Sequence, residues 1–320
     1  MRVLIAGSSG LIGTSLVPEL RRRDHEVLRL VRRTPRAPDE RGWDPPAGQI
    51  QDGALEGVDA IVNLCGVGIA DRRWSGARKQ LIRDSRVEPT EVLAAAAAAR
   101  GVPALLNASG INIYGDTGDR EVDETAPIGT GFLSAVCRDW EAAAFPQRGA
   151  PGTPSPNGTT SPDGAIVSNG TAASPGVATR VVLLRTGPVL SPSGGMIGKL
   201  RPLFKLMLGG RIGSGRQYFP WISLDDQVGA ITFLLERPEV SGPVNLVGPK
   251  PVTNSEFTAA LGNALHRPTP FPVPGAALKL VLGPDLAEEL VLTGPRAVPG
   301  VLSRAGYRFQ HTTISEALAA

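Results

Sequence analysis

The fold of this chain is decided near its N-terminus by the apolar run Val3-Leu4-Ile5-Ala6 and by Gly7-Ser8-Ser9-Gly10-Leu11-Ile12-Gly13, which follows it directly. This order predicts a β-strand, a tight turn and a helix over roughly residues 11–23. Gly7 permits the turn, Gly10 lets a pyrophosphate approach the backbone, and Gly13 lets the helix pack closely on the strand. The amides and dipole of the helix N-terminus would face the phosphates. We therefore predict a dinucleotide site that uses Gly7, Ser9, Gly10, Leu11, Ile12 and Gly13; the alternative is a purely structural glycine turn.

The end of the second predicted strand indicates which dinucleotide binds. It reads Leu28-Arg29-Leu30-Val31-Arg32-Arg33 and contains no carboxylate. Sites that prefer NAD place an acidic residue there, on the ribose 2′-hydroxyl. Arg32 is instead positioned to pair with a 2′-phosphate through its planar donor fork, and we count Arg33 with it. The pattern favours NADP(H), and the alternative is a solvated arginine at a strand end.

Beyond the glycine turn, apolar runs alternate with helical patterns. Strands are predicted over 27–31, 59–64, 104–108 and 180–185, and helices over 77–86, 91–100 and 133–144. This alternation predicts an α/β protein with a Rossmann-type, doubly wound parallel sheet. After residue 190 the alternation stops, although a helix over 225–235 and a strand over 244–247 follow. We expect a smaller, mostly helical C-terminal substrate lobe, with the ligand crevice between it and the strand ends.

The domain boundaries follow from this reading. Residues 1–190 are predicted to form the NADP(H)-binding domain and residues 191–320 the substrate-binding lobe, with 222–248 returning to the first domain. Residues 147–176 are rich in Pro, Gly, Ser and Thr and nearly lack charge and large apolar side chains. Such a segment buries too little surface to offset its ordering entropy, so we predict a disordered insertion between a helix and a strand.

Composition limits the remaining possibilities. The 320 residues are 42% hydrophobic and 20% charged, with a net charge of +3, which is typical of a soluble globular protein without nucleic-acid partners. The chain shows no signal-peptide layout, and no apolar run approaches the ~20 residues that span a bilayer. Cys65 and Cys137 show neither metal-ligand nor disulfide spacing, and the histidines are scattered. We expect a cytoplasmic protein without a metal, whose partner is a small-molecule substrate; the oligomeric state stays open.

Several further motifs resemble one family. The chain is similar to the extended short-chain dehydrogenase/reductases, and within them to an epimerase-like, SDR39U-type subgroup with an NAD-dependent epimerase/dehydratase N-terminal region and a DUF1731-like C-terminal region. The matching segments are Asn63-Leu64-Cys65-Gly66, Ile69-Ala70-Asp71-Arg72-Arg73-Trp74, Ile82-Arg83-Asp84-Ser85-Arg86, Cys137-Arg138-Asp139-Trp140-Glu141, Leu184-Arg185-Thr186-Gly187, Gly213-Ser214-Gly215-Arg216-Gln217 and Ala305-Gly306-Tyr307-Arg308-Phe309. The resemblance implies a Rossmann fold that binds NADP(H), with further cofactor residues at Asn63, Cys65, Gly66 and Arg86.

The chain departs from this superfamily at its catalytic pair. There a Tyr transfers the proton, and a Lys four residues later lowers the pKa of the phenol and holds the ribose. The three tyrosines here give the pairs Tyr114–Gly118, Tyr218–Ile222 and Tyr307–His311, so the pair is absent from the sequence. Alignment on Glu141 puts Leu133 at the Tyr position and Cys137 at the Lys position.

Two hydroxyl groups remain as candidate catalytic residues. The segment Ala108-Ser109-Gly110-Ile111-Asn112-Ile113-Tyr114-Gly115 follows a predicted strand and resembles the Ser-containing segment of the superfamily. Ser109 could hydrogen-bond a substrate carbonyl, and Tyr114 could replace the missing proton donor. The alternative is a strand-end turn with an aromatic packing contact.

The expected substrate pocket is apolar. In sugar-nucleotide epimerases an Arg clamps the diphosphate just after the Gly-x-Gly-x-Gln turn, whereas Phe219 stands at that place here and Arg216 is shifted by three residues. Trp74 and Trp221 would extend the wall, which suits a flatter or more apolar substrate than a nucleotide sugar. We predict a pocket formed by Trp74, Arg216, Phe219 and Trp221; ordinary packing between the lobes is the alternative for the aromatic residues.

Three functions fit these observations. The first is an NADP(H)-dependent oxidoreductase that lacks the Tyr-Lys pair and acts on a small carbonyl or enone compound. The second is a non-catalytic NADPH-binding sensor or scaffold module. The third, a nucleotide-sugar epimerase, needs a proton-transfer pair and a phosphate clamp that the chain lacks. The sequence leaves open the substrate, the direction of the reaction, the proton donor and whether turnover occurs.

Overall fold

The computed structural model describes residues 1–145, 178–191 and 194–319. At its centre is an eight-stranded sheet with the order β12-β8-β6-β5-β1-β2-β3-β4. The pairs are parallel except β3–β4, which is antiparallel. The strands are β1 (Arg2–Ala6), β2 (Glu26–Val31), β3 (Glu40–Asp44), β4 (Gln49–Ile50), β5 (Ala60–Asn63), β6 (Ala104–Gly110), β8 (Arg180–Thr186) and β12 (Gly242–Leu246). The predicted α/β class and doubly wound parallel sheet are confirmed.

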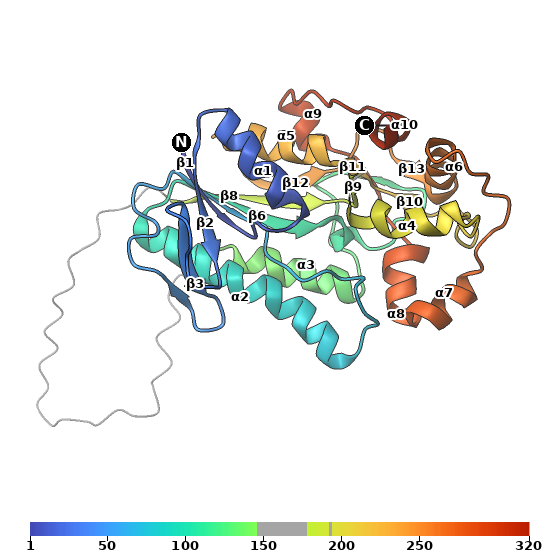
Figure 1. The fold of residues 1–320 in the computed structure, drawn as a ribbon, viewed down its shortest axis with the longest axis horizontal. Coiled ribbons are helices and arrows are strands. Elements are labelled where there is room, and N and C mark those ends of the chain that lie inside the picture. Colours follow the sequence, from blue (N-terminus) through green and yellow to red (C-terminus); the bar gives the residue numbers. More distant parts are fainter. Residues whose placement is uncertain (146–177, 192–193, 320) are drawn as a thin grey trace, which may run out of the picture.

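Helices cover both faces of this sheet (Figure 1). Helices α1 (Leu11–Arg22) and α5 (Leu224–Leu235) lie on one face, and α2 (Gly76–Arg100) and α3 (Phe132–Ala143) lie on the other. Strand β1 shows why, because its side chains point alternately to the two faces. Val3 and Ile5 join the core beneath α1 and α5, whereas Leu4 and Ala6 join the core beneath α2. A strand buried on both faces is apolar at its buried positions, as Val3, Leu4, Ile5 and Ala6 are.

The connections position the site. The chain leaves β1 into α1 on one face and leaves β5 into α2 on the opposite face, although β1 and β5 are neighbours. A crevice opens at the carboxyl ends of the strands where the connections diverge in this way, and it is the usual ligand position in open α/β sheets. The ends of β2, β1, β5, β6 and β8 follow one another along this edge.

Two local predictions need correction. The helices predicted over 77–86 and 91–100 form one helix, α2, which begins after Ser75 and ends at Gly101 with a left-handed backbone. Pro89 interrupts the hydrogen-bond ladder inside it, but the helix continues because Leu93 and Ala97 bury its inner face in the core. Strand β3 was not predicted, since only its first and fourth residues are buried and the strand contains three charged residues and a glycine.

The remaining elements lie mostly in a smaller lobe beyond the carboxyl ends of the strands, except that α9 (Gly300–Arg304) packs against β12 of the sheet (Figure 1). They are β7 (Glu121–Val122), β9 (Val189–Ser191), β10 (Tyr218–Phe219), β11 (Ile222–Ser223), β13 (Val252–Thr253), β14 (Arg296–Ala297), the 3₁₀-helix η1 (Ile111–Tyr114), α4 (Gly195–Lys205), α6 (Asn254–Ala264), α7 (Gly275–Leu282), α8 (Pro284–Ala287), the π-helix η2 (Glu288–Leu292), α9 (Gly300–Arg304) and α10 (Ile314–Ala319). The domain boundaries stay a prediction, and the insertion predicted over 147–176 lies outside the described residues. No helix in the described ranges has the length and apolar character needed to cross a bilayer.

Candidate functional site

The glycine turn is pressed against the loop that follows β5. Gly7 has a φ of +82°, and a Cβ there would lie 2.8 Å from the Leu64 carbonyl oxygen. A Cβ on Gly13 would lie 2.5 Å from the Gly7 oxygen, so neither position tolerates a side chain. Gly10 has more room, with its nearest neighbour at 3.5 Å. These contacts hold residues 7–13 in one conformation, a backbone cradle whose surface at Gly10 carries no side chain.

The first turn of α1 completes this cradle. Gly10 is its N-cap residue and provides no side-chain cap. The first amides of a helix have no partner inside the helix, so those of α1 are left for a ligand. Ser9 and Gly10 are exposed, whereas Leu11 and Ile12 are half-buried. Helix α4 begins over this turn, because a Cβ on Gly195 would lie 2.9 Å from Leu11 Cδ2.

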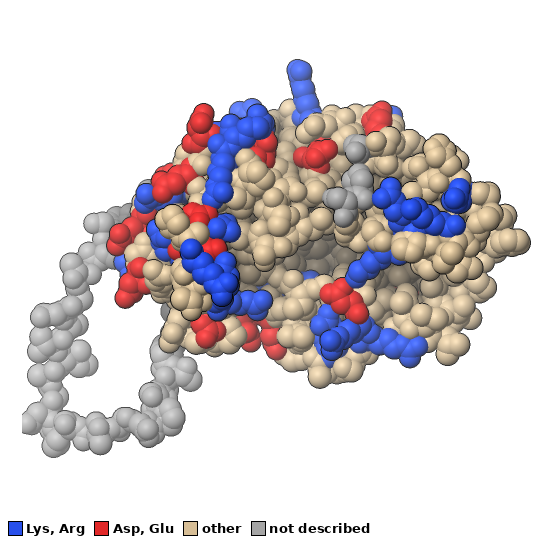
Figure 2. Space-filling model, in the orientation of Figure 1, with Lys and Arg blue, Asp and Glu red and all other residues tan. Residues whose placement is uncertain are grey.

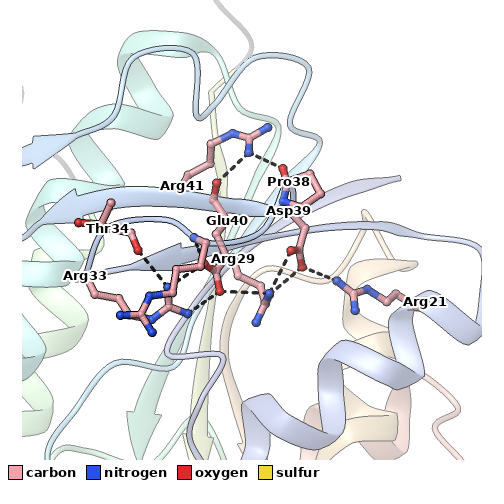
Figure 3. Close-up of polar contacts among 9 residues, drawn as sticks. Arg21, Arg29, Arg33, Thr34, Pro38, Asp39, Glu40 and Arg41 are labelled. Atoms are coloured by element: carbon pink, nitrogen blue, oxygen red, sulfur yellow. Dashed lines mark hydrogen bonds and ion pairs between the residues drawn. The ribbon is translucent and has the colours of Figure 1, made fainter.

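Carboxylates lie beside the end of β2, which the sequence did not indicate (Figure 3). Asp39 and Glu40 enter from the start of β3, where Arg29 stands opposite Glu40 in the parallel register. Asp39 accepts hydrogen bonds from Arg29 at 2.7 and 3.0 Å and from Arg21 at 2.5 Å. Arg29 and Arg21 lower the pKa of Asp39 to about 2. Glu40 accepts from the Arg33 fork at 2.8 and 2.6 Å. Arginines thus neutralise both carboxylates.

Arg32 and Arg33, the two predicted phosphate-binding residues, therefore differ in whether a carboxylate already binds the guanidinium. The fork of Arg33 is bound to Glu40, whose side chain is 3% exposed. Arg32 is exposed and has neither a hydrogen bond nor an ion pair with any residue in the described ranges. Its charge acts on the Cys65 thiol, so it lies near the end of β5. Arg32 is the guanidinium that is free for a ligand phosphate here.

The end of β5 is held by buried polar contacts. The Asn63 amide donates to Asn107 Oδ1 at 2.7 Å and to Thr90 Oγ1 at 2.9 Å, and its oxygen accepts from the Cys65 amide at 3.1 Å. Asn63 thus holds the loop that follows β5 in position through the Cys65 amide. Burial raises the pKa of the Cys65 thiol to about 12, which keeps it protonated. Gly66 lies against Arg86, because a Cβ on Gly66 would be 3.1 Å from the guanidinium carbon.

Both candidate catalytic hydroxyls belong to one buried polar network. Ser109, 4% exposed, donates to Glu141 Oε1 at 2.7 Å. Arg185 donates to both Glu141 oxygens at 2.8 and 2.9 Å and to the Tyr114 hydroxyl at 2.8 Å. Tyr114 in turn donates to Asn245 Oδ1 at 2.8 Å. Burial raises the pKa of Tyr114 despite the nearby guanidinium. Arg185 thus links Ser109, through Glu141, to Tyr114. Both hydroxyl groups already donate their protons, Ser109 to Glu141 and Tyr114 to Asn245.

A small pocket of about 50 Å³ lies between the end of β6 and the lobe. Its lining residues are Ile111, Asn112, Pro188, Gln217, Tyr218, Phe219, Pro220, Asn254, Leu290, Val291, Thr293, Gly294 and Pro295. Phe219 is the one residue of the predicted pocket set in this lining. Within the described ranges, no group of His, Cys, Asp and Glu side chains is placed to hold a metal ion.

The other predicted pocket residues lie elsewhere. Trp221 is 1% exposed and packs in the core of the lobe, where the apolar run around it buries the ring. The Arg216 side chain is 82% exposed and points toward Asp119, 3.9 Å away. Trp74 packs edge-on against Phe132, with ring centroids 5.1 Å apart. Trp74 thus packs within the sheet domain, Trp221 lies in the core of the lobe, and Arg216 lies at the surface, while a substrate pocket formed by these residues stays a prediction.

Polar contacts join the lobe to the sheet domain around the crevice. The Glu289 carboxylate accepts from the Phe132 and Leu133 amides at 2.8 and 2.7 Å and so caps α3. Lys199 on α4 pairs with Asp71 in the loop after β5, at 2.7 Å. On this face the surface is hollowed between basic side chains over β2 and β3 and basic side chains over α4 (Figure 2). Sequence reasoning missed Glu289, because its partner helix is distant in the chain.

Comparisons with known proteins agree on one family. Residues 3–133 match the model of the NAD dependent epimerase/dehydratase family, and residues 273–320 match a domain of unknown function, DUF1731. The epimerase family protein Mb2239 of Mycobacterium bovis is 52% identical over 99% of this chain and 96% of its own length. The human epimerase family protein SDR39U1 is 36% identical over 99% of this chain and 98% of its own length.

Solved structures extend this likeness. Human SDR39U1 (isoform 2), solved with NADPH, has a TM-score of 0.83 and 34% identity, covering 100% of this chain and 98% of its own. The nucleoside-diphosphate sugar epimerase of Corynebacterium glutamicum has a TM-score of 0.75 and 32% identity, covering 100% of this chain and 57% of its own. MoeE5 in complex with UDP-glucose and NAD, at 19% identity and a TM-score of 0.70, shares the fold.

Proposed function

This chain belongs to the NAD-dependent epimerase/dehydratase family, and from that premise we propose that it is an NADP(H)-dependent oxidoreductase. The observation that carries the proposal is the bare backbone cradle at Gly10 with the unpaired Arg32 beside it. A pyrophosphate would be held by the α1 amides and a 2′-phosphate by Arg32. The residues fit the cofactor, because no side chain stands on Gly10, where the phosphates would approach. The relative solved with NADPH supports the same reading.

The pocket at the end of β6 suits a small carbonyl or enone compound. Its wall is mainly apolar, and its volume of about 50 Å³ is far below the roughly 300–1,000 Å³ of drug-sized ligand sites. Asn112 supplies a polar group, since its Nδ2 makes only a long contact of 3.4 Å with the Glu289 carbonyl oxygen. We assign this amide to the substrate carbonyl. The nicotinamide of bound NADP(H) supplies the hydride chemistry.

We assign Ser109 and Tyr114 to holding this site instead of transferring a proton. Proton transfer by a phenol needs a free hydroxyl with a pKa near the working pH. Tyr114 is already bonded to Arg185 and Asn245, and burial raises its pKa. The Ser109 hydroxyl already donates its hydrogen bond to Glu141. The proton is then supplied by solvent at the pocket mouth.

The same network favours a second function, a non-catalytic module that binds NADPH and signals its presence. In the described part of the catalytic segment, both candidate hydroxyls already make hydrogen bonds to neighbouring side chains. A protein that binds the cofactor without catalysis would be expected to have such a site. A nucleotide-sugar epimerase is less favoured, because the pocket is small and Phe219 stands where a phosphate-binding arginine would be needed.

Turnover separates these functions. Purified full-length protein is incubated with NADPH and a panel of quinones, enones and aldehydes, with NADH as the matched control. A separate incubation contains UDP-glucose with NADP⁺ or NAD⁺, because epimerisation of the sugar needs an oxidised cofactor to accept the hydride. Steady loss of reduced-nicotinamide absorbance with a carbonyl or enone, faster with NADPH than with NADH, supports the oxidoreductase. Tight NADPH binding without loss across the panel supports the module, and conversion of the sugar nucleotide supports the epimerase. Absence of NADPH binding contradicts the first two functions, and absence of binding of any nicotinamide cofactor contradicts all three.

A further inference from the structure

The end of helix α4 exposes a group of large apolar side chains. The chain turns back there through Gly209 and Gly210, and a Cβ on Gly210 would meet the carbonyl oxygen of Phe271, so the two segments touch. Single exposed apolar residues are ordinary, whereas a contiguous group of them marks a binding surface. We call this group the α4 patch. Its members, with their exposed fractions, are Leu203 (45%), Leu206 (69%), Met207 (48%), Leu208 (64%) and Phe271 (72%).

The backbone holds the end of α4 in one shape. The Met207 amide donates to the Phe204 carbonyl oxygen and the Leu208 amide to that of Leu203, both at 2.9 Å. These two bonds form the Schellman motif that ends many helices, and the residue at the place of Met207 is usually Gly, because the backbone there is left-handed. Met207 has a φ of +58°. The protein thus keeps a large apolar side chain at a strained position where about half of it stays exposed, and packing inside the described part of the chain does not account for it.

The surroundings of the α4 patch are basic. Residues 194–224 contain five Lys and Arg residues and no Asp or Glu, and residues 257–284 contain two such cations and again no acidic residue. Figure 2 shows basic side chains gathered over α4. Carboxylates from other segments pair with Lys199, Lys279 and, at 3.9 Å, with Arg216. The exposed cations of these two segments that form no ion pair in the described ranges are Arg201, Lys205, Arg211 and Arg267.

The unpaired cations lie close to the apolar side chains. Arg201 and Lys205 are four residues apart on α4, so they project from the same side of the helix. Lys205 is also the residue directly before Leu206, and Arg211 directly follows the two glycines of the turn. The surface is therefore an apolar centre with free positive charges at its edge.

This combination selects the occupant. A second copy of the chain would bring the same unpaired cations together across a two-fold axis, where they repel. An anionic lipid bilayer matches both parts of the surface. Its headgroups attract the cations, and the boundary between headgroups and acyl chains accepts the apolar side chains.

We propose that the α4 patch binds this protein to the surface of an anionic lipid bilayer. Leu206 and Leu208 enter the boundary between headgroups and acyl chains, while Arg201 and Lys205 lie among the lipid headgroups. The inference goes beyond the proposed function, since it needs neither cofactor nor turnover. Earlier on the same helix, Lys199 pairs with Asp71 at the crevice. Binding thus places the crevice within roughly 15 Å, about the length of α4, of the lipid.

Vesicle flotation tests the proposal. Full-length wild type is mixed with phosphatidylcholine vesicles that either contain or lack phosphatidylserine, at low and at high salt. We expect binding to the vesicles with phosphatidylserine only, and weaker binding at high salt, because the cations are exposed. Lys205→Glu should bind at least about fivefold more weakly, the contribution of one basic side chain at such a surface. Leu206→Ser should bind about tenfold more weakly, since it removes apolar surface that the lipid would bury.

Matched controls lie at the opposite end of the molecule. Helix α2 begins beside the lobe, where Lys79 pairs with Asp285 at 2.6 Å, and it ends at Arg100, roughly 35 Å further along the helix. Arg100 is exposed and has no ion pair among the described residues, so Arg100→Glu makes the same charge change as Lys205→Glu. Phe145→Ser removes an apolar side chain that is 49% exposed, just after α3. Both controls should bind the vesicles within about twofold of wild type.

The other occupants are outcomes of the same experiment. No binding of wild type to vesicles with phosphatidylserine overturns the proposal, as does an equal loss in the variants and the controls. Binding to polyglutamate without binding to vesicles overturns it in favour of an acidic protein. Self-association of wild type in place of vesicle binding, abolished by Leu206→Ser in analytical ultracentrifugation, overturns it in favour of a second copy. None of these outcomes depends on NADPH, so the proposed function is tested separately.

A second measurement locates the contact without removing the patch. Leu208→Trp places an indole on the patch, and Arg100→Trp places one at the control position. Fluorescence is compared with wild type on phosphatidylserine vesicles that contain brominated phosphatidylcholine, which quenches indoles inserted among the lipids. We expect quenching of the added fluorescence in Leu208→Trp and none in Arg100→Trp. Vesicle-bound Leu208→Trp without quenching contradicts the proposal.

Discussion

Arginines and carboxylates cluster at both ends of the crevice, but water reaches only one cluster freely. At the β2–β3 end, the Arg21 and Arg33 side chains are 49% and 48% exposed. At the β6–β8 end, the Arg185 and Glu141 side chains are 7% and 10% exposed. Exposed ion pairs contribute about 0–1 kcal/mol, whereas breaking one partner of a buried pair costs about 3–5 kcal/mol. The first cluster is therefore free to tune ligand binding, while the second is tied to the stability of the fold.

The largest expected effect follows from breaking the buried cluster. Glu141→Gln keeps the shape of the side chain but leaves the Arg185 guanidinium without its counter-ion. We expect the free energy of unfolding to fall by about 3–5 kcal/mol, measured by urea denaturation. Asp39→Asn, the matched change in the other cluster, should cost less, because the Asp39 and Arg29 side chains are 22% and 28% exposed and stay in contact with water. Equal losses in the two variants would remove the distinction between the clusters.

The next effect concerns ligand binding at the exposed end. Arg32→Asp replaces the unpaired guanidinium by a carboxylate that repels a 2′-phosphate and can accept from a ribose hydroxyl. We expect NADPH affinity to fall at least about tenfold and NADH affinity to rise, measured by calorimetry. Arg33→Met should lose less, because Arg33 is bound to Glu40. Unchanged NADPH affinity in Arg32→Asp would show that Arg32 does not meet the phosphate.

A smaller effect is expected at Ser109. Ser109→Ala removes one of the donors to Glu141, while both Arg185 contacts remain. The free energy of unfolding should fall by about 1 kcal/mol, with NADPH affinity unchanged. Turnover, if present, should survive, since we assign Ser109 a holding role. Abolished turnover in a variant that binds NADPH normally would return Ser109 to the chemistry.

The last effect, absent at neutral pH, is a pH dependence at the exposed end. Arg29 and Arg21 lower the pKa of Asp39 from 3.8 to about 2 in the folded protein. A carboxyl whose pKa is depressed on folding stabilises the fold above its unfolded pKa and loses that contribution as the pH falls through the folded pKa. Between pH 3.8 and about 2, wild type should therefore lose more stability than Asp39→Asn. Parallel urea-denaturation profiles for the two proteins would contradict this.

The sequence predicts local features of this molecule better than distant pairings. The glycine turn was readable because strand, turn and helix are contiguous, and the parallel sheet followed from buried strands alternating with helices. Strand β3 was missed because Glu40 is buried by Arg33 and Arg29, a reason that hydropathy does not express. The carboxylates beside β2 were missed because they come from the start of β3, and the pairing of β3 with β2 is not visible in the sequence.

The candidate site was less predictable because its partners lie far apart in the chain. Ser109 and Tyr114 were singled out as candidate catalytic hydroxyls, yet both are bonded to partners, Glu141 and Asn245, that are 32 and 131 residues away. No spacing rule connects such residues before the fold is known. Trp221 was predicted to form a pocket wall because Phe219 and Pro220 precede it in the sequence. A large apolar ring in such a segment is equally compatible with a core, which is where Trp221 lies.

The central claim is that the cradle of Gly7, Gly10 and Gly13, together with Arg32, binds a phosphorylated nicotinamide cofactor. The most direct measurement is a calorimetric titration of the folded full-length protein with NADPH and, separately, with NADH. The account predicts saturable binding of NADPH, at least about tenfold tighter than that of NADH, from the charge-assisted contacts to the 2′-phosphate. No detectable binding of either form, or equal binding of both, would contradict it.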